Sequence, residues 1–342
     1  MTFELLFGIG LIAMGAFSSG SFSIPFGRTR NWAWENYWLI YSLFAYVIVP
    51  VVACYVFCPG FMNVLSGIPA QTLGWIFILG FIYGVCNLTF GLSLRYLGLS
   101  LGFSLSLGLM MILGTIIPPA IDGRLSVLLQ QSGGTMLIAG LLIAAVGIAL
   151  SGYAGYRKDK GAGPEANPEL DFKKGLLLVL FVGITGASQA LGIEQGAEIS
   201  SAIIASGVNP LFQTLPVFPI LFGGSFLATA LWCLFLSKRN NNLKAFMKTK
   251  EVGVLSNYLY CALAGFLWFI NFIFFGMGKS RMGEFSFTAW GIMMSLTIVF
   301  ATLWGLYRGE WKATDTKTKA WMYAGLVVLV IASFVIGMSG GE

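Results

Sequence analysis

Histidine is absent from this 342-residue chain, and charged residues make up only 10% of it. An ordinary soluble domain is roughly 25% charged, so this chain has too few charges to cover a surface that faces water. The five cysteines show no C-x-x-C spacing, and without histidine they leave few ligands for a transition metal. We therefore expect no metal site and no cofactor, and we interpret the cysteines as small buried hydrophobic residues.

Signs of catalysis and of phosphate binding are scarce as well. The chain has no P-loop of the G-x-x-x-x-G-K-[ST] form, and the centres of its apolar segments hold no carboxylate pair. No Lys or Arg stands at those centres, although a buried phosphate would need cationic partners. We therefore expect a protein that is not an enzyme and whose ligand is small and neutral.

Apolar sequence is what the chain has in abundance. Hydrophobic residues make up 57% of it, more than a water-soluble core needs, so its solvent is lipid. A helix that spans a bilayer needs about 20 mostly apolar residues. The sequence predicts an all-α polytopic membrane protein with ten such helices, at residues 5–25, 37–57, 72–94, 99–118, 135–154, 175–192, 208–236, 254–277, 285–306 and 320–338.

The distribution of positive charge predicts how these helices are oriented. The net charge is +6, which could suggest a nucleic-acid partner, but the basic residues lie in short loops between apolar runs. With ten helices, 17 of the 20 Lys and Arg fall on one side of the membrane. The positive-inside rule places that side in the cytoplasm and both termini in the periplasm. The expected partner is therefore the lipid bilayer, and no nucleic acid.

The polar connector 155–174 divides the chain into two five-helix segments, 1–154 and 175–342. Because five is odd, two copies of one unit would cross the membrane with opposite orientation. Sequence echoes support such a repeat. Phe103–Met111 (FSLSLGLMM) returns at Phe285–Met294 as FSFTAWGIMM.

A second echo lies in the preceding helices, where Gly80-Phe-Ile-Tyr matches Gly265-Phe-Leu-Trp. An inverted repeat of this kind is typical of secondary transporters. We expect a substrate cavity between the two halves, lined by the first, third, fourth, sixth, eighth and ninth helices. One half would rock against the other to open the cavity to each side in turn.

Several stretches of the chain resemble a known family. They are Asn87, Gly91 and Arg95-Tyr-Leu-Gly-Leu-Ser-Leu-Gly, followed by Gly114-Thr-Ile-Ile-Pro, together with Trp32-Ala-Trp-Glu35, Gly207-Val-Asn-Pro-Leu and Leu215-Pro216. In these residues the chain resembles the L-rhamnose–proton symporter family, from about residue 8 to residue 338. The resemblance implies a ten-helix fold of the drug/metabolite transporter superfamily in the inner membrane of a bacterium. It also implies the uptake of a deoxy sugar, L-rhamnose, with a proton.

The apolar runs contain amides, hydroxyls and large aromatic side chains, the mixture that binds sugars. The candidate substrate-binding residues are Asn87, Gln189, Gln213, Trp268, Asn271, Trp290, Ser18 and Ser19. Each has an ordinary structural alternative: amides and hydroxyls join neighbouring helices, and tryptophans pack in cores. Trp290 is the residue inserted where the second echo departs from the first, and an asymmetric residue suits a stereospecific site.

Proton coupling requires a group that gains and loses a proton during the transport cycle. Glu35 is the first candidate, because it lies at the start of the second predicted helix among several aromatic residues. Its alternative is an interfacial carboxylate that is solvated or paired with a nearby arginine. Arg95 is such a partner, or an inner gate, or one of the positive-inside charges. The secondary candidates for proton coupling are Glu194, Glu198 and Glu284.

Together these features predict a proton-coupled importer of a neutral deoxy sugar that works by alternating access. The alternative is a secondary transporter of a different small neutral solute, such as another sugar or an amino acid, acting as importer or exporter. A channel is a third possibility of a different class, and it would need charges that line a pore in mid-membrane.

Overall fold

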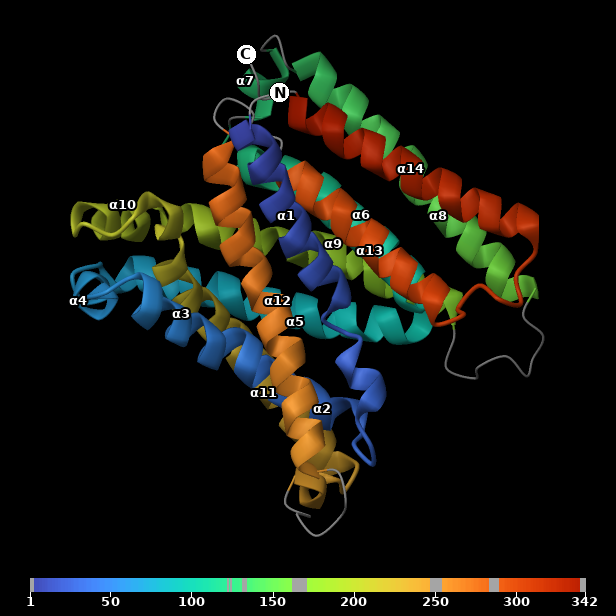
Figure 1. The fold of residues 1–342 in the computed structure, drawn as a ribbon, viewed down its shortest axis with the longest axis horizontal. Helices are drawn as coiled ribbons and strands as arrows, with labels where there is room; N and C mark the ends of the chain where they lie inside the picture. Colours follow the sequence, from blue (N-terminus) through green and yellow to red (C-terminus); the bar gives the residue numbers. More distant parts are fainter. Residues whose placement is uncertain are drawn as a thin grey trace. The chain divides into compact units, whose positions relative to one another are not determined.

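The computed structural model describes residues 3–121, 123, 125–130, 134–161, 171–246, 254–282 and 289–338. Every regular element in these residues is helical, which confirms the expected all-α chain (Figure 1). The longer helices are α1 (Phe3–Ser21), α5 (Ala70–Leu97), α6 (Leu99–Ile121), α8 (Gly134–Gly161), α9 (Phe172–Gln195), α11 (Phe218–Arg239), α12 (Val254–Arg281), α13 (Ala289–Tyr307) and α14 (Thr316–Met338). The shorter α-helices are α2 (Trp34–Leu43), α3 (Val49–Phe57), α4 (Phe61–Ser66), α7 (Leu125–Gln130) and α10 (Ala197–Ala205). Short 3-10 or π turns make up η1 (Pro25–Arg28), η2 (Phe44–Ile48), η3 (Pro210–Phe212), η4 (Leu215–Val217) and η5 (Leu243–Phe246).

Within the described residues, seven helical runs are long and apolar enough to cross a bilayer. They are Leu6–Arg28, Trp34–Phe57, Ala70–Leu97, Gly134–Lys158, Phe172–Ala205, Pro210–Arg239 and Val254–Arg281. Two shorter apolar helices, Leu99–Leu113 and Ile292–Tyr307, fall on two further predicted spans. The chain is therefore a polytopic membrane protein, while the number of ten crossings stays a prediction.

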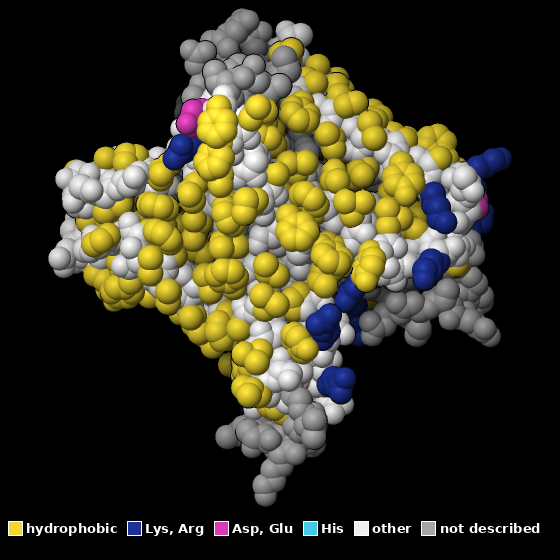
Figure 2. Space-filling view, viewed as in Figure 1, with side chains coloured by type: hydrophobic (Ala, Val, Ile, Leu, Met, Phe, Trp, Pro, Cys, Tyr) yellow, Lys and Arg dark blue, Asp and Glu magenta, His cyan; other side chains and the backbone are white. Residues whose placement is uncertain are grey.

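The surface supports a bilayer as the solvent. Hydrophobic side chains cover most of the face drawn in Figure 2. Leu142 of α8 is 64% exposed and Leu255 of α12 is 74% exposed. Water-soluble monomers rarely show apolar patches of this extent, so these side chains face hydrocarbon.

Two of the predicted spans are interrupted in the structure. The second contains the π turn η2 between α2 and α3. Pro50 is the second residue of α3, where its missing N–H leaves a carbonyl without its usual donor. The seventh begins with the 3-10 turns η3 and η4. Pro210, Pro216 and Pro219 each occupy one of the first two positions of η3, η4 and α11, so each proline stands where a new helical segment begins.

By its internal contacts the chain divides into two compact units. Unit 1 consists of Met1–Gly20, Cys86–Ala187 and Met277–Glu342, and unit 2 of Ser21–Val85 and Ser188–Gly276. Each unit takes segments from both halves of the sequence. The boundaries at residues 85–86, 187–188 and 276–277 fall inside α5, α9 and α12.

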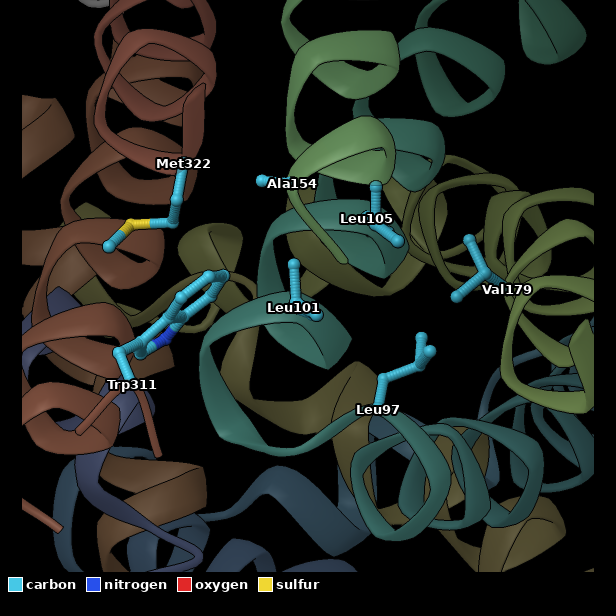
Figure 3. Packing of buried hydrophobic residues seen from close by; sticks show 7 residues of the cluster. All are labelled: Leu97, Leu101, Leu105, Ala154, Val179, Trp311 and Met322. Atoms are coloured by element: carbon cyan, nitrogen blue, oxygen red, sulfur yellow. The ribbon is translucent and has the colours of Figure 1, made fainter. Parts of the chain in front are cut away.

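In unit 1, α8 and α14 lie side by side along much of their length (Figure 1). Their contact is close, because a β-carbon at Gly147 of α8 would lie 2.8 Å from Leu329 Cγ of α14. A cluster of buried side chains in the same unit points inward from five helices and the α13–α14 loop (Figure 3). It consists of Leu97, Leu101, Leu105, Ala154, Val179, Trp311 and Met322.

In unit 2, two helix crossings depend on glycine. The backbone of α5 approaches α11 so closely at Gly80 that a β-carbon there would overlap the carbonyl oxygen of Leu221. Ser225 Oγ of α11 donates a hydrogen bond to Gly80 O at 2.7 Å in the same place. At Gly265 of α12, a β-carbon would lie 2.6 Å from Phe44 Cβ of η2. Each glycine thus lets a long helix touch one of the two interrupted ones.

Candidate functional site

Glu35 lies in the first turn of α2 and is only 5% exposed. Its Oε1 accepts hydrogen bonds from two side-chain amides that follow α11, at 2.7 Å from Asn240 Nδ2 and 2.6 Å from Asn242 Nδ2. Burying an ionised carboxylate is unfavourable unless donors face it, and a helix N-terminus adds partial positive charge. The surroundings of Glu35 therefore stabilise a buried carboxylate.

Hydrogen bonds on either side hold the polypeptide around Glu35 in place. The backbone N of Arg30 donates to Asn257 Oδ1 at 2.9 Å, and Asn257 Nδ2 donates back to Arg30 O at 2.8 Å. Trp32 Nε1 donates to Ala245 O at 3.2 Å. These bonds fix the segment before α2 to the start of α12 and to η5, so Glu35 has a defined position.

The secondary acidic candidates lie in different surroundings. Glu194 near the end of α9 and Glu198 at the start of α10 are both exposed. Glu198 Oε2 accepts a hydrogen bond from Thr72 Oγ1 at 3.4 Å. Glu284 lies outside the described residues. Among the described candidates for proton coupling, Glu35 is the buried one.

The candidate amides divide between the two units. Asn87 of α5, in unit 1, is 3% exposed, and its Oδ1 has no hydrogen-bond partner among the described residues. Gln189 of α9, in unit 2, is 5% exposed, and within the described part of the chain its Nε2 is likewise unpartnered. Gln213 follows η3 and is half-buried, and Asn271 Nδ2 donates to Trp268 O on its own helix. Asn87 and Gln189 thus each have one buried polar atom without a hydrogen-bond partner among the described residues.

Trp268 of α12 is buried in an aromatic cluster of unit 2. Its ring packs edge-on to Tyr46 of η2 and to Phe222 of α11, each at 5.1 Å between centroids, and against Phe272 at 5.2 Å. In this conformation Trp268 has the surroundings of a core residue. Trp290 belongs to α13, but its side chain lies outside the described residues.

The remaining candidates belong to unit 1. Ser18 of α1 is buried and Ser19 is half-buried, and Arg95 is exposed in the last turn of α5. The structure therefore places Ser18, Ser19, Asn87 and Arg95 in unit 1, and Glu35, Gln189, Gln213, Trp268 and Asn271 in unit 2. Within unit 2 it brings Trp268 and Asn271 together on one turn of α12, and it joins Glu35 to Asn240 and Asn242.

Asn240 and Asn242 were not singled out by sequence reasoning. They belong to an Asn-Asn-Asn run after the basic end of α11, which has the composition of an ordinary solvated loop. The run itself favours a tight turn, since Asn tolerates positive φ, and in the structure Asn241 adopts φ +56°. Only the fold reveals that this turn faces Glu35.

Glu310, in the loop between α13 and α14, also escaped sequence reasoning. Its two carboxylate oxygens accept hydrogen bonds from the backbone N of Leu99 at 2.7 Å and of Ser100 at 3.1 Å. Leu99 begins α6 directly after Gly98, whose φ is +80°, so Glu310 caps α6 from a distant part of the chain. The run Gly98-Leu-Ser-Leu-Gly matches G-x-S-x-G, but the chain lacks the histidine of a Ser-His triad.

At the other end of this loop, Asp315 precedes α14. Its Oδ1 accepts from Thr318 N at 2.6 Å, and its Oδ2 lies 3.0 Å from Arg157 Nη2 of α8. The hydrogen bonds from Thr318, followed by the charge of Arg157, hold the pKa of Asp315 below its usual value. The loop is therefore attached to α6 at one end and to α8 at the other, both within unit 1.

Comparison with known proteins shows which family the sequence resembles. Residues 1–341 match the family model described as L-rhamnose-proton symport protein (RhaT). Curated proteins named L-rhamnose-proton symporter from Yersinia pestis (strain Pestoides F) and Yersinia pseudotuberculosis (strain YPIII) are each 30% identical over 341 residues. The match covers 99% of this chain and 99% of each relative. No solved structure matches the chain.

Proposed function

The chain belongs to the L-rhamnose–proton symporter family, and we propose that it carries L-rhamnose into the cell together with a proton. The observation that carries this proposal is the family match over residues 1–341 of a chain that is helical and apolar enough to cross the membrane several times. The protein is a multi-pass transporter of the bacterial inner membrane and not an enzyme.

We infer an architecture of ten membrane helices in two inverted halves, 1–154 and 175–342, with a cytoplasmic connector and periplasmic termini. The crossings at the repeated glycines support it. Gly80, in the third predicted helix, contacts α11 of the seventh, whereas Gly265, in the eighth, contacts η2 of the second. Exchanging the halves turns one contact into the other, which is the behaviour expected of an inverted repeat.

In the proposed cycle the halves rock about a sugar that is bound between them, and protonation of Glu35 selects which side opens. Burial of Glu35 supports this role, because a carboxyl that trades its proton inside the protein can bias two conformations. The proposed sugar ligands are the amides of Asn87, Gln189, Gln213 and Asn271, the hydroxyls of Ser18 and Ser19, and the rings of Trp268 and Trp290. Arg95 is proposed as an ion-pair partner or gate, and Glu194, Glu198 and Glu284 as secondary proton sites.

The unpartnered atoms of two amides favour a substrate role for them. Asn87 Oδ1 is an acceptor and Gln189 Nε2 is a donor, and both are buried. A sugar hydroxyl could satisfy either atom, whereas an apolar solute could satisfy neither.

The test is Glu35→Gln in proteoliposomes loaded to impose an inward proton gradient. We expect the variant to bind L-rhamnose and to exchange it across the membrane without accumulating it, because glutamine cannot release a proton. Glu4→Gln is the matched control, since it removes an exposed carboxylate that pairs with Arg281, and it should accumulate sugar normally. Accumulation of sugar by Glu35→Gln would refute the assignment of Glu35.

Substrate identity is tested separately with wild-type protein. Binding of L-rhamnose should raise the unfolding temperature, and unlabelled L-rhamnose should compete with labelled L-rhamnose for uptake. A panel of other sugars and neutral amino acids serves as the control. Stronger competition by one of those solutes would contradict L-rhamnose as the substrate.

A further inference from the structure

The amide of Asn242 is satisfied on one side only. Its Nδ2 donates to Glu35 Oε1 at 2.6 Å, while its Oδ1 is buried and has no hydrogen-bond partner in the described part of the chain. A carboxylate can only accept hydrogen bonds, whereas a protonated carboxyl also donates one. The Nδ2 donor of Asn242 therefore matches the ionised form of Glu35, and its Oδ1 acceptor would match the protonated form.

We propose that Asn242 reads the protonation state of Glu35, by donating to the carboxylate and, after its amide turns over, accepting from the carboxylic acid. This inference rests on the proposed role of Glu35 in proton coupling. Asn240 acts with Asn242 in the ionised state, since both amides share the same oxygen of Glu35.

Proton binding changes the kind and the strength of the hydrogen bonds that this cluster makes. The ionised Oε1 accepts two hydrogen bonds, and bonds to a charged acceptor are roughly twice as strong as neutral ones. A proton on Oε1 turns that atom into a donor, so the two amides can no longer both donate to it at full strength. The turn that carries Asn240 and Asn242 is then held less tightly to α2.

The hydrogen bonds that Asn257 and Trp32 make between the same segments do not depend on the proton. Asn257 bonds the backbone of Arg30 in both directions, and Trp32 bonds the carbonyl of Ala245. None of these groups titrates in the range where a carboxyl does. Protonation therefore weakens the hydrogen bonds between Glu35 and the Asn240–Asn242 turn, while the bonds of Asn257 and Trp32 persist. Such a difference between neighbouring contacts is what a hinge requires.

The elements that pack against α2, and the segment before it, carry other titratable or charged groups. They are Tyr46 of η2, Cys233, Lys238 and Arg239 of α11, Lys244 of η5, and Arg28 and Arg30. Cys233 is buried and interacts electrostatically with Glu35. The five cationic side chains are exposed, so solvent screens their charges.

The experiment measures the midpoint of Glu35 protonation in purified full-length protein. The carboxylic-acid C=O band in infrared difference spectra reports the protonated form, and Glu35→Gln identifies the band by removing it. Asn242→Leu, which loses the donor, should move the midpoint to higher pH by about 1–2 units, the effect of losing one hydrogen bond to a charged group. Asn242→Asp adds a second carboxyl and should move it at least as far.

Asn257→Ala is the matched control, because it breaks two hydrogen bonds of the same region without touching Glu35. It should slow uptake and leave the midpoint unchanged. The pH dependence of L-rhamnose uptake in proteoliposomes should shift in the same direction as the midpoint for Asn242→Leu and stay in place for Asn257→Ala.

The outcomes separate this inference from the proposed function. If Glu35→Gln abolishes accumulation but neither Asn242→Leu nor Asn242→Asp moves the midpoint, the role of Asn242 is refuted and that of Glu35 stands. If Glu35→Gln still accumulates sugar, the role of Glu35 in coupling is refuted, whatever the Asn242 variants do. If Asn257→Ala moves the midpoint as far as Asn242→Leu, the effect is structural and the inference is wrong.

Discussion

Glu310 is expected to stabilise the start of α6 by a measurable amount. It supplies two acceptor oxygens to consecutive backbone N–H groups of Leu99 and Ser100, at 2.7 and 3.1 Å. Glu310→Ala leaves both donors without this partner and also removes a negative charge from a helix N-terminus. Loss of a capping side chain costs about 0.5–2 kcal/mol, and loss of the charge at a helix end about 0.3–1 kcal/mol. For this half-buried carboxylate we expect a total of about 2 kcal/mol.

Glu310→Gln divides this effect into its parts. Glutamine keeps one acceptor oxygen and has no charge, so it should retain about half of the stabilisation. Lys312→Ala is the control, since it changes an exposed side chain of the same loop and should alter the free energy of unfolding by less than about 0.5 kcal/mol.

The assay is reversible unfolding of the purified protein in mixed micelles, followed by circular dichroism. The expected order of stability is wild type and Lys312→Ala, then Glu310→Gln, then Glu310→Ala. A Glu310→Ala variant as stable as Lys312→Ala would refute the reasoning, because the cap would then contribute nothing beyond a surface side chain.

Three further predictions concern packing, pH and the substrate. Gly80→Ala should prevent the close approach of α5 to α11 and lower the yield of folded protein, whereas Gly74→Ala on the same helix meets no atom within 4 Å and should be tolerated. Asp315, whose pKa is lowered by hydrogen bonds at the start of α14, stabilises the protein above its unfolded pKa of about 4 and loses this effect as pH falls through the lower folded value. Asp315→Asn should therefore flatten the acid side of a stability-versus-pH curve, and an unchanged curve would contradict this. Asn87→Leu should raise the KM for L-rhamnose while leaving the unfolding temperature close to that of wild type, and an unchanged KM would exclude Asn87 from the sugar site.

The helical, membrane-spanning character of the chain followed from its sequence because it depends on composition and local pattern. Long apolar runs must be helical in lipid, where each backbone group needs an internal partner, and prolines at 210, 216 and 219 break a helix wherever it lies. The π turn at Phe44–Ile48 was not predicted, because the same residues would also fit an ordinary α-helix. In the structure this turn packs against Gly265 of α12.

For the candidate site, the sequence by itself singled out Glu35, since a carboxylate in an aromatic, apolar stretch is unusual whatever its partners are. It also determined the family, through motifs distributed over the whole chain. Only the tertiary structure decided what faces that carboxylate. Asn240 and Asn242 are more than 200 residues away along the chain, as are Glu310 and the start of α6 that it caps. Such pairs are joined by folding, and a pattern read along the chain contains no information about which distant loops will meet.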